Sequence, residues 1–137
     1  MVKVIRSETG REYPTVSYSF VPVQKPAVTT PESQKTLDEE IKRLSKKYGQ
    51  DKKLVRKIID CEGRLYDNGE WEVHQNYDKW MSKDFGPIQI NDHWHKEKMD
   101  KLGMNIYDWR DSLEYGVMLL KNQGLEPWNA SRVCWSK

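Results

Sequence analysis

The stretch that decides how the chain is organised is Asp84-Phe85-Gly86-Pro87-Ile88-Gln89-Ile90-Asn91. In its second half two isoleucines alternate with two amides: Ile88, Gln89, Ile90 and Asn91. A period of two puts neighbouring side chains on opposite faces of an extended segment. The isoleucines can therefore anchor one face while the amides meet a ligand on the other. We expect this stretch to form one wall of a binding cleft.

A glutamate precedes this stretch, at the end of a predicted amphipathic helix that starts with Asp51 as its cap. Glu62 follows Ile58 by four residues and Ile59 by three, so it projects from the same apolar face, and Gly63 then ends the helix. Burial raises the pKa of such a carboxyl group, as a general acid working near neutral pH requires. The alternative is a glutamate at a frayed helix end that points to water, and position alone leaves both interpretations open.

Between these two features, residues 64–83 are polar and aromatic, with Asp67-Asn68-Gly69 as the strongest turn signal of the chain. Residues 71–75 alternate as in a strand. Tyr77 and Trp80 are flat rings of the kind that stack on sugar faces, and core packing under a small sheet is the alternative.

The remainder of the chain is predicted to be helical after an N-terminal arm. Residues 1–32 are interpreted as an extended arm, with a possible hairpin of Val2–Arg6 and Val16–Phe20 and a linker at Val21–Thr30. Residues 33–137 are interpreted as one domain. Its further helices are expected at Leu37–Tyr48 with a Thr36/Glu39 capping box, at Trp94–Leu102, from Asp108 to near Gly124 as the core helix, and from Pro127. The fold class is α+β, mostly helical, with one small β-hairpin or sheet.

The charge is distributed unevenly, although the formal net charge is only +2. Residues 33–57 carry nine Lys or Arg against four acids, and residues 58–95 carry eight acids against three Lys or Arg. A basic flank can favour an anionic polymer, either nucleic acid or a cell-wall polymer. Solvated faces of two helices explain the same spacing better. Because no nucleic-acid-reading motif is present, a nucleic-acid partner is not expected.

Cysteine and histidine usage gives little reason to expect a metal. Cys61 and Cys134 form either one bridge in an exported protein or two buried thiols in a cytosolic one. His74, His93 and His95 lack a partner set for zinc, so neither a metal nor another cofactor is expected. No apolar run is long enough for a membrane span. A monomer is expected.

From about Leu37 to Trp135 the chain resembles the lysozyme-like superfamily, meaning c-type lysozymes and soluble lytic transglycosylase domains. In that family a helix ends with a catalytic glutamate, and a β-hairpin follows. A run of the form Asp-aromatic-Gly-x-x-Gln-Ile-Asn then leads back into helices. The matching parts here are Glu62, residues 64–83 and residues 84–91.

The resemblance implies a lysozyme-like fold in which Glu62 is the catalytic acid and Asp84 is the second carboxylate. Gln89 and Asn91 would shape the floor of a sugar cleft, with Tyr77, Trp80 and Trp128 as further substrate-binding residues. Residues 128–134 look like the tryptophan-rich segment that precedes a family cysteine. Cys61–Cys134 would then be the counterpart of a family disulfide.

The chain departs from the family in three places. The c-type proteins have more cysteines, and theirs lies about a turn before the glutamate instead of beside it. Transglycosylases usually have serine where this chain has Gly63, and their Gly-Leu-Met-Gln run becomes residues 86–89 here. These departures leave the branch of the superfamily open.

The implied activity is cleavage of the β-1,4 bond between N-acetylmuramic acid and N-acetylglucosamine in peptidoglycan. Asp84 beside the anomeric carbon would give hydrolysis, as in a muramidase. With Asp84 turned away, Glu62 alone would give the 1,6-anhydro product of a lytic transglycosylase. A non-catalytic module that binds glycan or protein is the third alternative. The expected location is secreted, periplasmic or cell-envelope, or that of a phage-type lysis or virion protein.

Overall fold

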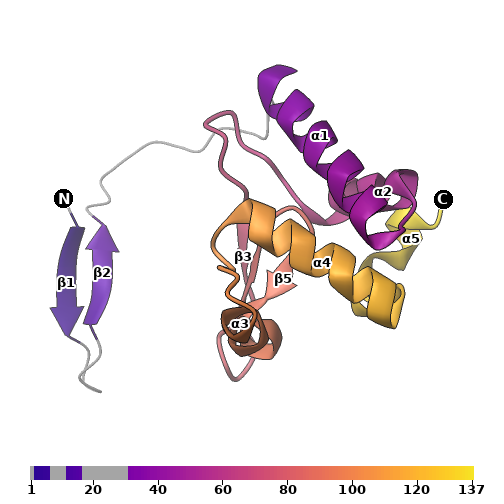
Figure 1. The fold of residues 1–137 in the computed structure, drawn as a ribbon. Coiled ribbons are helices and arrows are strands. Elements are labelled where there is room, and N and C mark those ends of the chain that lie inside the picture. Colours follow the sequence, from indigo (N-terminus) through magenta and orange to yellow (C-terminus); the bar gives the residue numbers. More distant parts are fainter. Residues whose placement is uncertain (1, 7–11, 17–30) are drawn as a thin grey trace.

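The computed structural model describes residues 2–6, 12–16 and 31–137. It is a mostly helical α+β structure with a small three-stranded antiparallel sheet (Figure 1). In chain order its elements are β1 (Val2–Arg6), β2 (Glu12–Val16), α1 (Pro31–Tyr48), α2 (Lys52–Glu62), β3 (Val73–Gln75), β4 (Lys83–Phe85), β5 (Ile90–Asn91), α3 (Asp92–Lys101), α4 (Trp109–Gln123), the 3-10 helix η1 (Glu126–Ser131) and α5 (Arg132–Trp135).

Local capping explains where two of the helices begin. Asp51 accepts a hydrogen bond from the Lys53 amide at the start of α2, and Asp108 does the same for the Arg110 amide at the start of α4. Both caps were predicted from the sequence and are confirmed. The predicted capping box at Thr36 is wrong, because α1 begins at Pro31 and Thr36 lies inside it. Proline suits a first helical position, where no amide donor is needed.

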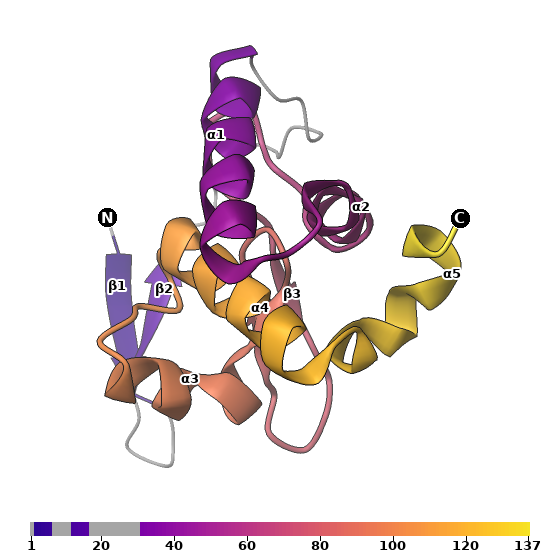
Figure 2. The ribbon, with the colours of Figure 1, turned by 45° about the vertical axis from the view of Figure 1, so that its right-hand side comes forward.

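Helix α4 forms the centre of the core, as predicted. It runs between α1 and α3 in both Figure 1 and Figure 2. Leu113 and Val117 are fully buried on it. A Cβ atom at Gly116 would lie 2.4 Å from Cγ2 of Ile88, so glycine permits the close approach of α4 to the turn that follows β4. The predicted cleft wall is thus anchored directly on the core helix.

The predicted small hairpin or sheet is a three-stranded antiparallel sheet. β3, β4 and β5 pair in this order, and residues 86–89 form the turn between β4 and β5. Ile88 is therefore a buried turn residue and not part of a strand. The turn around Asp67–Gly69 lies outside this sheet and closes an isolated bridge between Leu65 and Trp71.

The N-terminal strands pair with each other. β1 is antiparallel to β2, which confirms the first predicted strand. The second strand is Glu12–Val16, and the predicted strand at Val16–Phe20 lies, except for Val16, outside the described residues. Pro14 is tolerated because a two-stranded ribbon leaves edge positions without a partner. The predicted linker at Val21–Thr30 lies outside the described residues. Among those that are described, no helix is long and apolar enough to cross a membrane.

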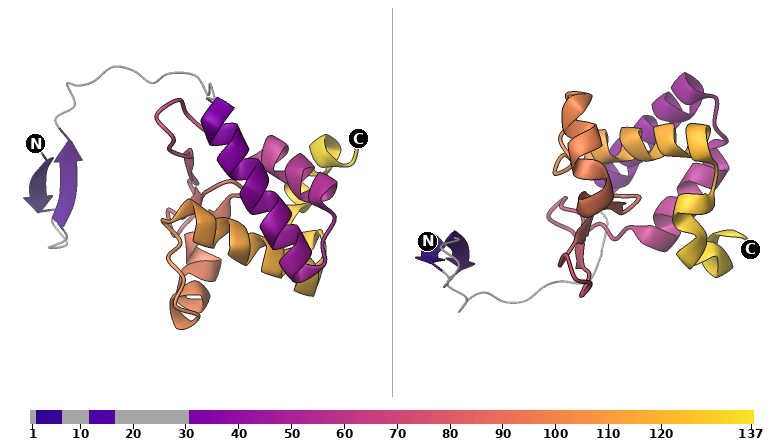
Figure 3. Two further views of the ribbon diagram at one scale, coloured as in Figure 1. Left: turned by 45° about the horizontal axis from the view of Figure 1, so that its top comes forward. Right: turned by 90° about the horizontal axis from the view of Figure 1, so that it is seen from below.

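A disulfide joins the end of α2 to α5. Cys61, near the end of α2, is bonded to Cys134 in α5, with their Cα atoms 5.9 Å apart. Figure 3 shows α5 lying beside α2 in both of its views. Glu62 is the residue after Cys61. The bond therefore holds the segment from Trp128 to Trp135 next to Glu62.

Candidate active site

A cleft of about 520 Å³ contains both predicted carboxyl groups, Glu62 and Asp84. Its walls come from the sheet, α3, the end of α4 and η1, so segments distant in sequence meet there. The lining residues that matter for the chemistry are Glu62, Asp84, Gln89, Asn91, Trp94, His95 and Trp128.

Glu62 is the last residue of α2 and is half-buried. The Ser131 hydroxyl donates a hydrogen bond to its Oε1 atom. Burial raises the pKa of the Glu62 carboxyl, and the nearby charge of Asp84 raises it further. The Ser131 hydrogen bond and the charge of His74 act in the opposite direction without reversing the shift. The net effect favours the protonated form that a general acid needs.

A close approach at Gly63 sets the position of Glu62. A Cβ atom at Gly63 would lie only 2.3 Å from the Pro87 carbonyl oxygen and 2.9 Å from the Trp71 ring. Only glycine lets the end of α2 pack this tightly against the turn between β4 and β5. This contact explains why the chain has glycine, and not serine, after the glutamate.

Asp84 is held by two side-chain amides. Asn91 Nδ2 donates to its Oδ1 atom at 2.7 Å, and Asn76 Nδ2 donates to its Oδ2 atom at 3.1 Å. Amide donors of this kind stabilise a negative carboxylate and fix its orientation. In the strand register Asp84 lies between His74 on β3 and Asn91 on β5, so all three share one face of the sheet.

The two carboxyl groups therefore have different environments in one cleft. The Glu62 carboxyl is half-buried at a helix end with a raised pKa, while Asp84 accepts two amide hydrogen bonds. One cleft therefore contains a carboxyl group suited to donating a proton and a second carboxyl group in a different environment.

The side chains of Gln89 and Asn91 line the cleft as predicted, but their amide groups donate hydrogen bonds to other atoms of the protein. Gln89 Nε2 donates to the carbonyl oxygens of Gly86 at 2.9 Å and Glu72 at 3.0 Å. Asn91 caps α3 through the Trp94 amide while holding Asp84. Both residues thus build the cleft wall and orient its carboxylate, rather than presenting free amide donors to a ligand.

The three predicted aromatic residues have different positions. Tyr77 is 85% exposed and Trp80 is 44% exposed, and neither lines the cleft. Trp80 stacks on His93 with ring centroids 3.9 Å apart and meets Trp94 edge-on, and Trp94 does line the cleft. Trp128 is buried in the core, with its Nε1 atom donating to the Ile88 carbonyl. Trp128 is therefore held in the core while it also lines the cleft, and its predicted role in substrate binding stays a prediction.

Several site residues were missed in the sequence. Ser131, Asn76 and Trp94 contact a carboxyl group or line the cleft. Trp94 had a usable signal, because it follows the Gln-Ile-Asn run by three residues at the start of a helix. The sequence around Ser131 gave no such signal, since Ser131 is 69 residues from Glu62 along the chain.

The histidines occupy separate environments. His95 Nδ1 lies 2.9 Å from the Tyr115 hydroxyl, and burial lowers the pKa of His95, with Lys98 adding to the effect. His93 stacks on Trp80, and His74 lies in β3. In the described part of the chain no group of three or more His, Cys, Asp or Glu side chains is placed to hold a metal ion.

A second groove, of about 390 Å³, also has Glu62 in its lining. It is lined by the end of α2 and the segment before β3, including Gly63, Arg64, Leu65 and Trp71. Glu62 thus lines both hollows, the cleft and this groove.

Comparisons with known proteins do not indicate a function for the site. Neither a scan against protein-family models nor searches of curated proteins and of solved structures yield a significant match.

Proposed function

We propose that the chain is a lysozyme-like glycosidase that hydrolyses the β-1,4 bond between N-acetylmuramic acid and N-acetylglucosamine in peptidoglycan. The observation that carries the proposal is the pair of unlike carboxyl groups in one cleft. Glu62 has a raised pKa and a hydroxyl partner, and Asp84 is fixed by two amides. The lysozyme-like order of helix, sheet and helices supports the same proposal.

In this mechanism Glu62 donates its proton to the glycosidic oxygen of the leaving sugar. Asp84 stabilises the positive charge that develops on the other sugar, and water completes the hydrolysis. Ser131 orients the Glu62 carboxyl, and Asn76 and Asn91 orient Asp84. The Cys61–Cys134 disulfide favours a protein that works in an oxidising compartment outside the cytosol.

A lytic transglycosylase is the second candidate, favoured by the hydrogen bonding of Asp84. Because its two oxygens already accept amide protons, Asp84 is a weaker nucleophile than a free carboxylate. An electrostatic role for Asp84 fits both reactions. The identity of the group that attacks the anomeric carbon, water or the sugar's own 6-hydroxyl, separates them.

The test is the release of soluble fragments from purified peptidoglycan. We expect Glu62→Gln to abolish release while leaving the fold intact, because glutamine keeps the shape but cannot donate the proton. Glu97→Gln is the matched control, since Glu97 is exposed on α3 and forms a surface ion pair with Lys101. Retained release by Glu62→Gln overturns the proposal. Binding of the polymer without any release by the wild type indicates a non-catalytic module.

A further inference from the structure

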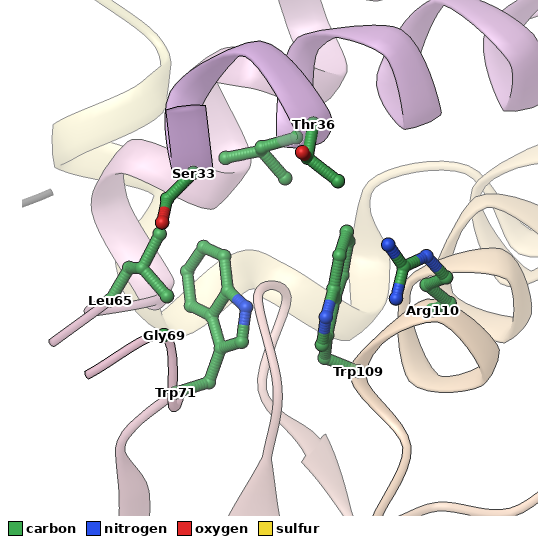
Figure 4. A pocket seen from close by; sticks show the side chains of 8 residues that line it. Ser33, Thr36, Leu65, Gly69, Trp71, Trp109 and Arg110 are labelled. Atoms are coloured by element: carbon green, nitrogen blue, oxygen red, sulfur yellow. The ribbon is translucent and has the colours of Figure 1, made fainter. Parts of the chain in front are cut away.

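Aromatic rings that pack on one another leave no room for a ligand, and the hollow beside the start of α1 is of this kind. Its indoles, those of Trp71 and Trp109, lie with ring centroids 6.3 Å apart, and Arg110 stacks on the outer face of Trp109 (Figure 4). The cleft that contains Glu62 differs, because one of its rings has a polar edge without a partner in the described part of the chain.

That ring is the imidazole of His95, a half-buried residue of α3. His95 lines the cleft together with Glu62 and Asp84, and the proposed mechanism gives it no role. An ionisable side chain with a shifted pKa in a cleft is a candidate for a functional role.

One edge of the imidazole is fixed by the core. Nδ1 of His95 lies 2.9 Å from the hydroxyl of Tyr115 in α4, and the two rings meet edge-on with centroids 5.3 Å apart. Tyr115 is only 4% exposed, and within residues 31–137 its hydroxyl has no other hydrogen-bond partner. Burial raises the pKa of Tyr115, so the hydroxyl keeps its proton. The hydroxyl therefore donates this proton to Nδ1 of His95.

The other edge of the imidazole is available to a ligand. Burial, with a smaller contribution from Lys98, lowers the pKa of His95, so the ring is uncharged at neutral pH and carries one proton. Because Nδ1 accepts from Tyr115, this proton lies on Nε2. Nε2 has no hydrogen-bond partner within residues 31–137 and is not buried. His95 thus presents one uncharged N–H donor in the cleft.

We propose that His95 binds the glycan by donating its Nε2–H group to an uncharged oxygen of a sugar residue in the cleft, and that Tyr115 is a positioning residue that holds the imidazole in the required tautomer. Sugar hydroxyls and N-acetyl carbonyls are acceptors of this kind. A donor that is already held in place loses little freedom when the ligand binds. The inference rests on the proposed function, because that function makes the ligand a glycan.

The first test measures binding of the N-acetylglucosamine trimer to the full chain by calorimetry. We expect His95→Leu, which removes both ring nitrogens, to weaken binding roughly fivefold, as the loss of one hydrogen bond would. His95→Gln should recover most of the affinity, because its amide nitrogen can take the place of Nε2. Glu97→Gln, at an exposed position of the same helix, should bind as the wild type does. Equal affinity of His95→Leu and the wild type, equal losses in His95→Leu and His95→Gln, or no binding by the wild type overturns the inference.

The tautomer provides a second readout, which a merely structural role of His95 would not change. NMR of the ring nitrogens at neutral pH should show the proton of His95 on Nε2 in the wild type, and the Nε2 signal should shift when the trimer is added. Tyr115→Phe, which keeps the buried ring but removes the hydroxyl, should show a mixture of both tautomers. A proton on Nδ1 in the wild type, an Nε2 signal that the trimer leaves unchanged, or a single tautomer in Tyr115→Phe contradicts the inference.

A comparison of binding with cleavage separates this inference from the proposed function. Binding of the trimer that depends on His95, without release of fragments from peptidoglycan, refutes the glycosidase and leaves the role of His95 intact. Release that depends on Glu62 but is as fast in His95→Leu as in the wild type refutes the role of His95 and leaves the glycosidase intact.

Discussion

At the scale of single residues, the environment of Glu62 determines what the site can do. Its carboxyl is half-buried beside Asp84, and its pKa lies above the ordinary value of 4.5. The same desolvation that prepares a proton donor also costs folding stability once the group ionises. Function and stability should therefore oppose each other at this residue.

This opposition predicts a pH-dependent effect of Glu62→Gln on stability. Because the folded-state pKa is raised, native protein binds more protons than unfolded protein between the two pKa values. The stability that protonated Glu62 provides is thus fully present below about pH 4.5 and is lost as the pH rises through the folded-state pKa. We expect the melting temperature of Glu62→Gln to exceed that of the wild type at pH 7.5, with the gap closing at pH 4. Glu97→Gln, at an 85% exposed side chain, serves as the control. A gap that is the same at both pH values contradicts the explanation.

Asn76 provides a test of how Asp84 is positioned. Asn76→Ala removes one of the two amides that hold the carboxylate. Loss of a hydrogen bond to a charged group costs about 1.5–3 kcal/mol, so we expect turnover to fall by about tenfold or more. Asn68→Ala, in an exposed turn, should leave turnover unchanged. Turnover by Asn76→Ala equal to that of the wild type would show that Asp84 needs no such support.

At the scale of elements, the disulfide keeps Glu62 close to the segment that contains Ser131. It bonds α2 to α5 across a separation of 73 residues, and Ser131 lies three residues before Cys134. The serine that contacts Glu62 is therefore held in place by the bond beside it.

Replacing both Cys61 and Cys134 by serine should lower the free energy of unfolding by about 4 kcal/mol, from the loop-closure entropy of a bridge this long. Activity should fall as well, since the end of the chain loosens around Glu62. Chemical denaturation measures the first effect, and treatment of the wild type with a reductant should reproduce it. A loss below about 1 kcal/mol contradicts this role of the bond.

Features that depend on residues close together in the sequence could be predicted. Features that depend on contacts between distant segments could not. The caps at Asp51 and Asp108 and the exit of Glu62 from an apolar face depend on residues within one helical turn. Residues 86–89 were interpreted as partly extended because their alternation resembles a strand. The actual turn needs Gln89 at a φ of +56°, which is rare for a residue with a side chain.

The candidate site shows the same difference between local and long-range features. The sequence predicted Glu62 and Asp84, which the structure places in one cleft. It gave no sign that Asn91 donates to Asp84 or that the buried Trp128 donates to the Ile88 carbonyl. Both roles depend on which segments meet after folding. Tryptophan and asparagine look alike in sequence whether they contact a ligand or the protein.

At the scale of the whole molecule, Glu62 lines two hollows, which are the cleft that contains Asp84 and the groove that Trp71 lines. Such an arrangement fits a long polymer cut in its middle better than a small substrate bound in a closed pocket. The basic surface of α1 and α2 is partly neutralised, because Arg56 pairs with Asp38 and Lys47 with Glu114.

Mass analysis of the fragments released from purified peptidoglycan tests the central claim most directly. The wild type should release fragments with reducing N-acetylmuramic acid ends, and Glu62→Gln should release none. Anhydro ends would retain Glu62 as the acid but reject the hydrolysis assigned to the site. No fragments from the wild type, or the same fragments from Glu62→Gln, would contradict the account.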